Sequence, residues 1–170
     1  NVKGYRWQYG SNDTHFDYYD NAYRSAEFAT RVIRDIDLLP ASTTRDDIEG
    51  QARFLRALNN FDMVRIYSKI PTQSTDAGTS LGMYYLETVT PSPLPRLETV
   101  NATYQKILDD LLIAKDKIAA FGSTNLTNGT ASKTAVYALL SRVYLYMGDY
   151  PKVIEYGNLA TNNASAPVCP

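Results

Sequence analysis

Residues 136–160 read VYALLSRVYLYMGDYPKVIEYGNLA, and this stretch decides the fold. Apolar side chains recur at helical spacing on both sides of Gly148, at Val136, Leu139, Leu140, Val143 and Met147 before it and at Val153, Tyr156 and Ala160 after it. Gly148 can adopt the left-handed conformation that ends a helix. Asp149 can cap the next helix, and Pro151 is tolerated in its first turn. The stretch therefore predicts two helices folded back on each other.

The same hairpin matches the tetratricopeptide (TPR) pattern, a helix pair of about 34 residues. With Gly148 as the turn, the leucine, small and tyrosine positions of the repeat fall on Leu140, Ser141 and Tyr144, and its two small positions fall on Val153 and Ala160. Gly157 stands where a bulky aromatic residue is usual, so the match is partial. TPR units are scaffolds for binding, and the pattern leaves the ligand open.

The rest of the chain predicts three more helices and one long loop. We expect these three helices at about Asp17–Leu38, from near Thr44 to just before Pro71, and at Thr99–Ala120. The two helices of the hairpin are expected at Ser132–Met147 and Tyr150–Ala160. Glycines and prolines interrupt residues 71–97, which predicts an irregular loop, with a short strand at Met83–Val89 as an open alternative. The predicted fold class is all-α, with TPR-like helical hairpins stacked side by side.

Composition narrows the classes of function. The chain has 170 residues, which is enough for one domain, and a net charge of −1 gives no electrostatic reason to expect nucleic acid or an anionic membrane. Cys169 is the single cysteine, which excludes an internal disulfide and a cysteine metal cluster. No apolar run approaches the length of a membrane span. We interpret residues 1–170 as one TPR-like helical region, a piece of a longer protein.

Charged residues give no pattern of catalysis. Asp46-Asp47 and Asp109-Asp110 are neighbours that point apart on a helix, so we interpret both pairs as solvated faces. The second predicted helix contains Arg53, Arg56 and Arg65. We expect their aliphatic chains to lie at the edge of the core and their guanidinium groups to pair with acids or with helix ends. Binding of a carboxylate or a sugar is the alternative. His15 has no metal-ligand spacing around it. We therefore expect no catalytic residue, no metal, no cofactor and no enzyme activity.

Three stretches, in order, resemble the SusD/RagB family of nutrient-binding outer-membrane lipoproteins of Bacteroidetes. The first is Gln51–Ala57 (QARFLRA), continuing through Phe61–Arg65 to Pro71, and the second is Pro95-Arg96 followed by Tyr104, Ile107, Asp110-Leu111 and Ala114. The third is Gly129–Lys133 followed by Ala138–Tyr150 (ALLSRVYLYMGDY). Thr130 and Glu27 depart from the arginine and asparagine that are usual in the family.

The resemblance implies an outer-membrane, cell-surface lipoprotein that captures oligosaccharides, or in some members peptides. It implies delivery to a SusC-type TonB-dependent transporter as partner, with membrane association only through a lipid anchor outside this chain. It also implies that the TPR helices pack against the transporter and the rest of a longer chain, and that loops make the ligand contacts.

Sugar binding needs flat aromatic faces and planar polar groups. The N-terminal segment offers both, and we take Trp7, Tyr9, Asn12 and Asp13 as candidate ligand-binding residues. Trp7 could instead fill a core between this segment and a missing half. Tyr84 and Tyr85 could form a second stacking pair, or they could be disordered or face the transporter. A function from another class stays open: a TPR module that grips a partner peptide and has no small-molecule ligand.

Overall fold

The computed structural model describes residues 18–89, 98–118 and 129–162. Within these ranges the chain forms five α-helices, two short 3₁₀ helices and no β-strand, which confirms the all-α prediction. The elements are α2 (Tyr18–Asp35), η2 (Ile36–Leu38), α3 (Thr43–Tyr67), η3 (Ala77–Thr79), α4 (Val100–Lys117), α5 (Lys133–Met147) and α6 (Tyr150–Asn162).

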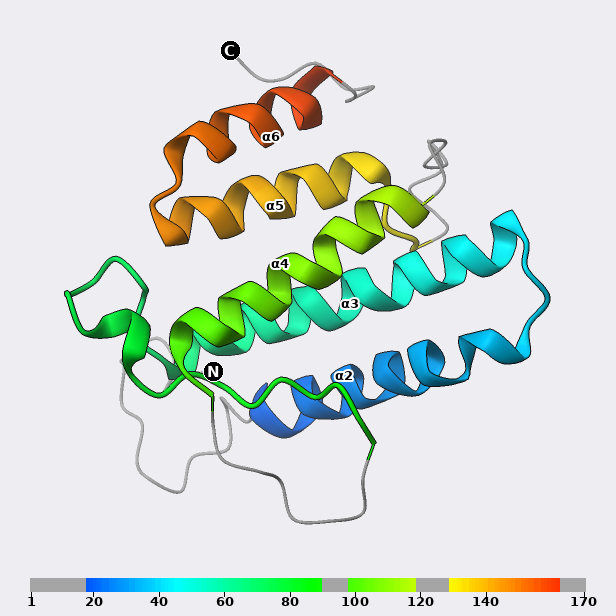
Figure 1. The fold of residues 1–170 in the computed structure, drawn as a ribbon, viewed down its shortest axis with the longest axis horizontal. Coiled ribbons are helices and arrows are strands. Elements are labelled where there is room, and N and C mark those ends of the chain that lie inside the picture. The colour runs from blue at the N-terminus through cyan, green and yellow to red at the C-terminus, as the bar shows by residue number, and fades with distance from the viewer. Residues whose placement is uncertain (1–17, 90–97, 119–128, 163–170) are drawn as a thin grey trace, which may run out of the picture.

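Figure 1 shows the helices stacked in chain order, from α2 through the crossed pair α3 and α4 to the hairpin of α5 and α6. Helices α3, α4 and α5 bury most of the stripe that their helical period predicts, whereas α6 buries only Tyr156 of its predicted stripe. The core contains the predicted inward residues of the third helix (Tyr104, Ile107, Leu108, Leu111, Ala114 and Ile118), together with Ala57, Phe61 and Val64 from α3 and Val136, Leu140 and Val143 from α5. This arrangement is the TPR-like stack expected from the sequence.

Helix ends follow from local chemistry. Ser42, Thr99 and Ser132 each accept a hydrogen bond from the backbone N–H three residues later, which satisfies an orphan donor at the starts of α3, α4 and α5. Asp149 does the same for the N–H of Lys152 in the first turn of α6. Gly148 has φ of 77° and closes α5 in the left-handed conformation, as predicted.

The predicted helix bounds hold within a few residues, with two differences. The last turn before Pro40 is the 3₁₀ helix η2, and the third predicted helix ends at Lys117 because Ile118 is extended, with φ −65° and ψ 127°. The strand considered at Met83–Val89 is wrong: in the described residues this part has one isolated antiparallel bridge, between Leu81 and Thr99. Most of the predicted polar turn at 121–130 lies outside the described residues.

In the three described ranges, none of the helices combines the length and the apolar composition that crossing a bilayer requires.

Candidate functional site

The segment that follows η3 is held by helix side chains. In Figure 1 it runs from η3 past the start of α4 and along α2. The Thr103 hydroxyl accepts a hydrogen bond from the Met83 N–H at 3.1 Å, and it lies 3.0 Å from the Met83 carbonyl oxygen. Tyr23 donates to the Tyr84 carbonyl at 2.8 Å, and Thr30 to the Leu86 carbonyl at 2.6 Å. Because helix hydroxyls satisfy these backbone groups, the segment needs no partner strand.

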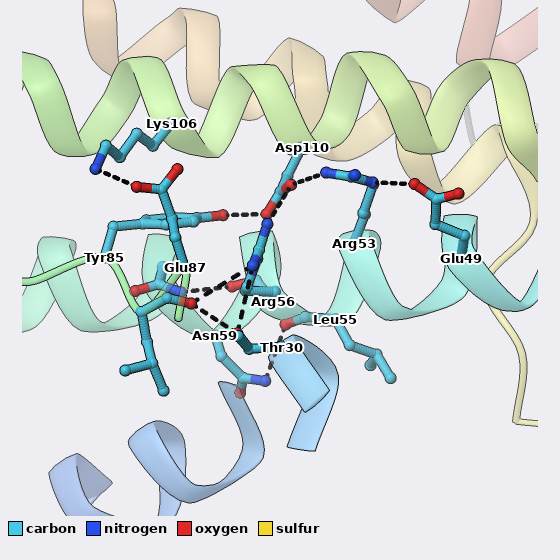
Figure 2. A network of polar contacts seen from close by, with 12 residues as sticks. Thr30, Glu49, Arg53, Leu55, Arg56, Asn59, Tyr85, Glu87, Lys106 and Asp110 are labelled. Carbon is cyan, nitrogen blue, oxygen red and sulfur yellow. Dashed lines mark hydrogen bonds and ion pairs between the residues drawn. The ribbon is translucent and has the colours of Figure 1, made fainter. Parts of the chain in front are cut away.

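Asp110 of α4 is the centre of the polar network beneath this segment (Figure 2). Arg56 of α3 binds it with two parallel bonds, from Nε to Oδ2 at 2.6 Å and from Nη2 to Oδ1 at 2.8 Å. Arg53 donates to Oδ1 at 2.9 Å, and the Tyr85 hydroxyl donates to Oδ2 at 2.6 Å. Asp110 is 3% exposed and Arg56 5% exposed, so this is a buried, bidentate ion pair with two further donors.

Two branches extend the network towards the surface (Figure 2). On one side Arg53 also binds Glu49 at 2.8 Å, and Lys117 at the end of α4 binds the other Glu49 oxygen at 2.9 Å. On the other side Lys106 bridges Glu87 and Glu98, both at 2.6 Å, which joins the middle of the loop between η3 and α4 to its last residues. The network therefore ties α3, α4 and this loop together.

Burial and pairing act on the charges in opposite directions. Burial alone would lower the pKa of Arg56, but the hydrogen bonds and charge of Asp110 outweigh it and raise that pKa. Burial, reinforced by the negative charge of Asp110, raises the pKa of Tyr85 well above its ordinary value. Burial would raise the pKa of Glu49, yet hydrogen bonds from Lys117 and Arg53 lower it overall. Arg56 therefore stays charged and Tyr85 stays a neutral donor.

The structure corrects the prediction of a sugar-stacking pair at Tyr84 and Tyr85. Tyr85 is 1% exposed, with its ring in the core and the Arg56 guanidinium over one face at 5.4 Å from the ring centre. Tyr84 is also buried. Neither ring offers a free face to a sugar, because Tyr85 lies in the core and Tyr84 is buried as well. Trp7, Tyr9, Asn12 and Asp13 lie outside the described residues, and their role stays a prediction.

The interpretation of Asp110 as part of a solvated face is wrong, although its neighbour Asp109 is exposed as expected. The sequence contains a signal for this burial: Asp110 lies three residues after Ile107 and four before Ala114, on the apolar face of α4. The pairing predicted for the arginines is confirmed. Arg53 and Arg56 bind acids in the network, and Arg65 binds Asp62 at 2.5 Å.

This arrangement can hold a loop in place but has no spare capacity for chemistry. Both Asp110 oxygens already accept two hydrogen bonds each, so the carboxylate has no lone pair directed at a substrate. Among the described residues no group of three or more histidine, cysteine, aspartate or glutamate side chains is placed to hold a metal ion.

Comparisons with known proteins agree with this fold. Residues 2–145 match a family model described as SusD-like, starch-binding and associating with the outer membrane. A curated SusD-like protein from Formosa agariphila is 25% identical over 150 residues, which is 86% of this chain and 27% of that protein. The chain thus spans about a quarter of the length of the curated relative.

Solved structures show the same helical stack. A candidate sugar-binding protein from Bacteroides vulgatus superposes with a TM-score of 0.82 at 24% identity, covering 95% of this chain and 36% of that one. A SusD superfamily protein from Bacteroides thetaiotaomicron superposes with a TM-score of 0.77 at 25% identity, covering 89% of this chain and 33% of that one.

Proposed function

We infer the function from one premise: the chain belongs to the SusD-like family, whose description is starch binding in association with the outer membrane. We propose that it binds an oligosaccharide at the outer membrane and delivers it to a SusC-type TonB-dependent transporter. The observation that carries this proposal is the family match over residues 2–145, which takes in the N-terminal segment, α2, α3, α4 and most of α5.

The helical stack suits the role of a rigid frame for ligand-binding loops. Asp110 joins α3, α4 and the loop after η3 through bonds of 2.6–2.9 Å, in a core that excludes water. A frame of this kind lowers the entropy lost on binding, because the segments attached to it are already ordered. Binding without bond cleavage is the activity that such a frame supports.

We propose that the N-terminal segment supplies the sugar contacts. Trp7 and Tyr9 would stack on the apolar face of a pyranose ring, and Asn12 and Asp13 would bond its hydroxyl groups. These four residues fall inside the part of the chain that the family model matches.

We further propose a cell-surface lipoprotein, held at the outer membrane by a lipid anchor outside residues 1–170. The partners would be the transporter and the oligosaccharide, with no nucleic acid. A lipid anchor would allow the helical frame to stay in water while it remains close to the barrel.

A single substitution tests the sugar site. In the full protein, Trp7→Ala should weaken binding of starch-derived oligosaccharides by about tenfold in calorimetry, since a lost aromatic contact of about 1.5 kcal/mol gives that factor. The melting temperature should stay within about 2 °C of wild type, as for a surface change. Tyr150→Ala is the matched control, because Tyr150 is an aromatic residue with 63% exposure at the start of α6.

Two results would contradict the proposal. If wild type binds none of the starch-derived oligosaccharides, the assigned ligand class is wrong. If Trp7→Ala keeps full affinity, or unfolds many degrees lower, Trp7 belongs to the core and the sugar site lies elsewhere.

A further inference from the structure

The Tyr104 hydroxyl and the Arg65 Nε are two buried polar atoms that have no hydrogen-bond partner among the described residues. Tyr104 lies on α4 and is 0% exposed. Arg65 lies near the end of α3, where its Nη2 binds Asp62 at 2.5 Å and its Nε is left over. Native proteins pair nearly all buried polar atoms, because a buried donor or acceptor without a partner costs stability. These two groups therefore need a partner that the described side chains do not supply.

The antiparallel packing of α3 and α4 brings the two groups together. Arg56 meets Asp110 and Phe61 meets Tyr104, so the residues after Phe61 face those before Tyr104. A helical side chain leans towards the N-terminus of its own helix, which directs the Tyr104 hydroxyl to the level of Arg65. The Tyr104 ring meets the Phe61 ring edge-on at 6.1 Å, and the Arg65 guanidinium carbon lies 4.9 Å from the centre of the same Phe61 ring.

Tyr146 at the end of α5 borders the same position. Arg65 Nη1 reaches the Tyr146 hydroxyl at 3.4 Å, and the Tyr146 ring meets Phe61 edge-on at 5.3 Å. Burial raises the pKa of Tyr104, the Tyr146 hydroxyl raises that pKa further, and the positive charge of Arg65 lowers it, as expected for groups close to one another. Helices α3, α4 and α5 thus each bring one polar group to this position.

The partner that suits this position is small and neutral. Arg65 already has Asp62 as its counter-ion, so the position requires no second charge. Tyr104 is fully buried, so a sugar or a peptide cannot reach its hydroxyl. A water molecule can accept hydrogen bonds from both an N–H and a phenol, and it has two hydrogens of its own to donate. Internal waters typically make about three hydrogen bonds to buried polar groups.

We propose that an internal water molecule binds between Tyr104, Arg65 and Tyr146 and joins α3, α4 and α5. Its oxygen accepts hydrogen bonds from the Arg65 Nε–H and the Tyr104 hydroxyl, and one of its hydrogens is donated to the Tyr146 oxygen. Gln51 already links α3 to the start of α5, through two hydrogen bonds with the Ala131 backbone at 2.7 and 2.8 Å. The water links α3 to the end of α5.

A crystal structure of the full protein tests whether the water is present. At about 1.5 Å resolution it should show a water oxygen within about 3.2 Å of both the Tyr104 hydroxyl oxygen and the Arg65 Nε. An empty position, or a protein atom in place of the water, would overturn the proposal.

The variant Tyr104→Phe tests the hydrogen bond through the direction of the change in stability. If the hydroxyl binds water, its loss should raise the unfolding equilibrium constant of the full protein about fivefold in urea, the effect of one net hydrogen bond. If the hydroxyl has no partner, phenylalanine removes an unsatisfied group, and stability stays the same or rises. Tyr150→Phe is the matched control, because Tyr150 is 63% exposed and the loss of its hydroxyl should leave stability unchanged.

Arg65→Lys keeps the charge but removes the Nε, so it tests whether one water binds both groups. Tyr104→Phe should then cost less in the Arg65→Lys background than in wild type. Three results would overturn the proposal: a Tyr104→Phe protein at least as stable as wild type, an equal loss in Tyr150→Phe, or additive effects of Tyr104→Phe and Arg65→Lys. None of these measurements involves an oligosaccharide, so each of them overturns this inference and leaves the proposed function standing.

Discussion

Replacing Asp110 by asparagine tests whether the buried network holds the helices and the loop together. Asparagine has the same shape, but one of its two positions becomes an NH₂ donor. If that donor replaces Oδ1, it faces Arg53 and Arg56; if it replaces Oδ2, it faces Arg56 and Tyr85. Either way two donors meet a donor, and the charge of a 5%-exposed arginine loses its counter-ion.

The magnitude follows from the burial of this pair. Removing one partner of a buried ion pair costs about 3–5 kcal/mol, because the remaining charge is left uncompensated in a medium of low polarity. For a chain of this size each kcal/mol lowers the melting temperature by about 2–4 °C, so Asp110→Asn should lower it by about 6–20 °C. Urea unfolding followed by circular dichroism measures the free energy directly.

The neighbouring residue provides the control. Asp109 is exposed and accepts one hydrogen bond, from Gln105 at 2.8 Å, so Asp109→Asn should change stability by less than about 0.5 kcal/mol. A second comparison uses Tyr85→Phe, which removes the hydroxyl that donates to Asp110 at 2.6 Å. Its cost should be smaller in the Asp110→Asn background, because the acceptor has already changed.

The reasoning would be refuted if Asp110→Asn lowered the free energy of unfolding by less than about 1 kcal/mol. A loss of that size is ordinary for a surface substitution or for one lost hydrogen bond. Additive effects of Asp110→Asn and Tyr85→Phe would also refute it, because two groups in one network should be coupled.

Three further outcomes are expected. Leu140→Ala should cost about 2–5 kcal/mol in urea unfolding, because Leu140 is fully buried in α5; a loss under about 0.5 kcal/mol would show that this side chain is not in the core. Gly148→Ala should cost about 1–2 kcal/mol, because the φ of 77° suits glycine and the new Cβ would lie 3.0 Å from the Thr72 methyl group; unchanged thermal stability would contradict this. The pKa of Glu49 is lowered from 4.5, so the stability that the Glu49 carboxylate contributes is present above pH 4.5 and is lost as pH falls through the folded pKa. Glu49→Gln should therefore flatten the decline of stability below about pH 4.5. An unchanged profile of stability against pH would show that Glu49 does not stabilise the fold in this way.

Most of the fold could be predicted from the sequence because local signals determine it. The apolar stripes of α3, α4 and α5 repeat at helical spacing, and Ser132, Gly148 and Asp149 have the side-chain or backbone properties that begin and end helices. These signals act within a few residues, so a single sequence contains them in full.

The loop after η3 was predicted less well, because its conformation depends on distant residues. The partners of Met83, Tyr84 and Leu86 are hydroxyl groups 20 to 61 residues away in the chain. A run of apolar and aromatic residues is typical of a strand or of a buried extended segment, and local pattern cannot distinguish the two. The possible strand and the possible stacking pair at Tyr84 and Tyr85 were wrong for this one reason.

Asp110 shows how a polar residue on an apolar helix face should be interpreted. Its position between Ile107 and Ala114 predicts burial, and burial of a carboxylate requires donors. The donors come from Arg53 and Arg56, which lie on the face of α3 that meets α4, and from Tyr85, whose ring is carried by the loop. Because the loop supplies one donor, α3 supplies the other donors and α4 supplies the acceptor, the network around Asp110 is complete only when the loop is docked. Docking of the loop and packing of α3 against α4 should therefore be lost together on unfolding, and the helical frame and its longest described loop form one cooperative unit.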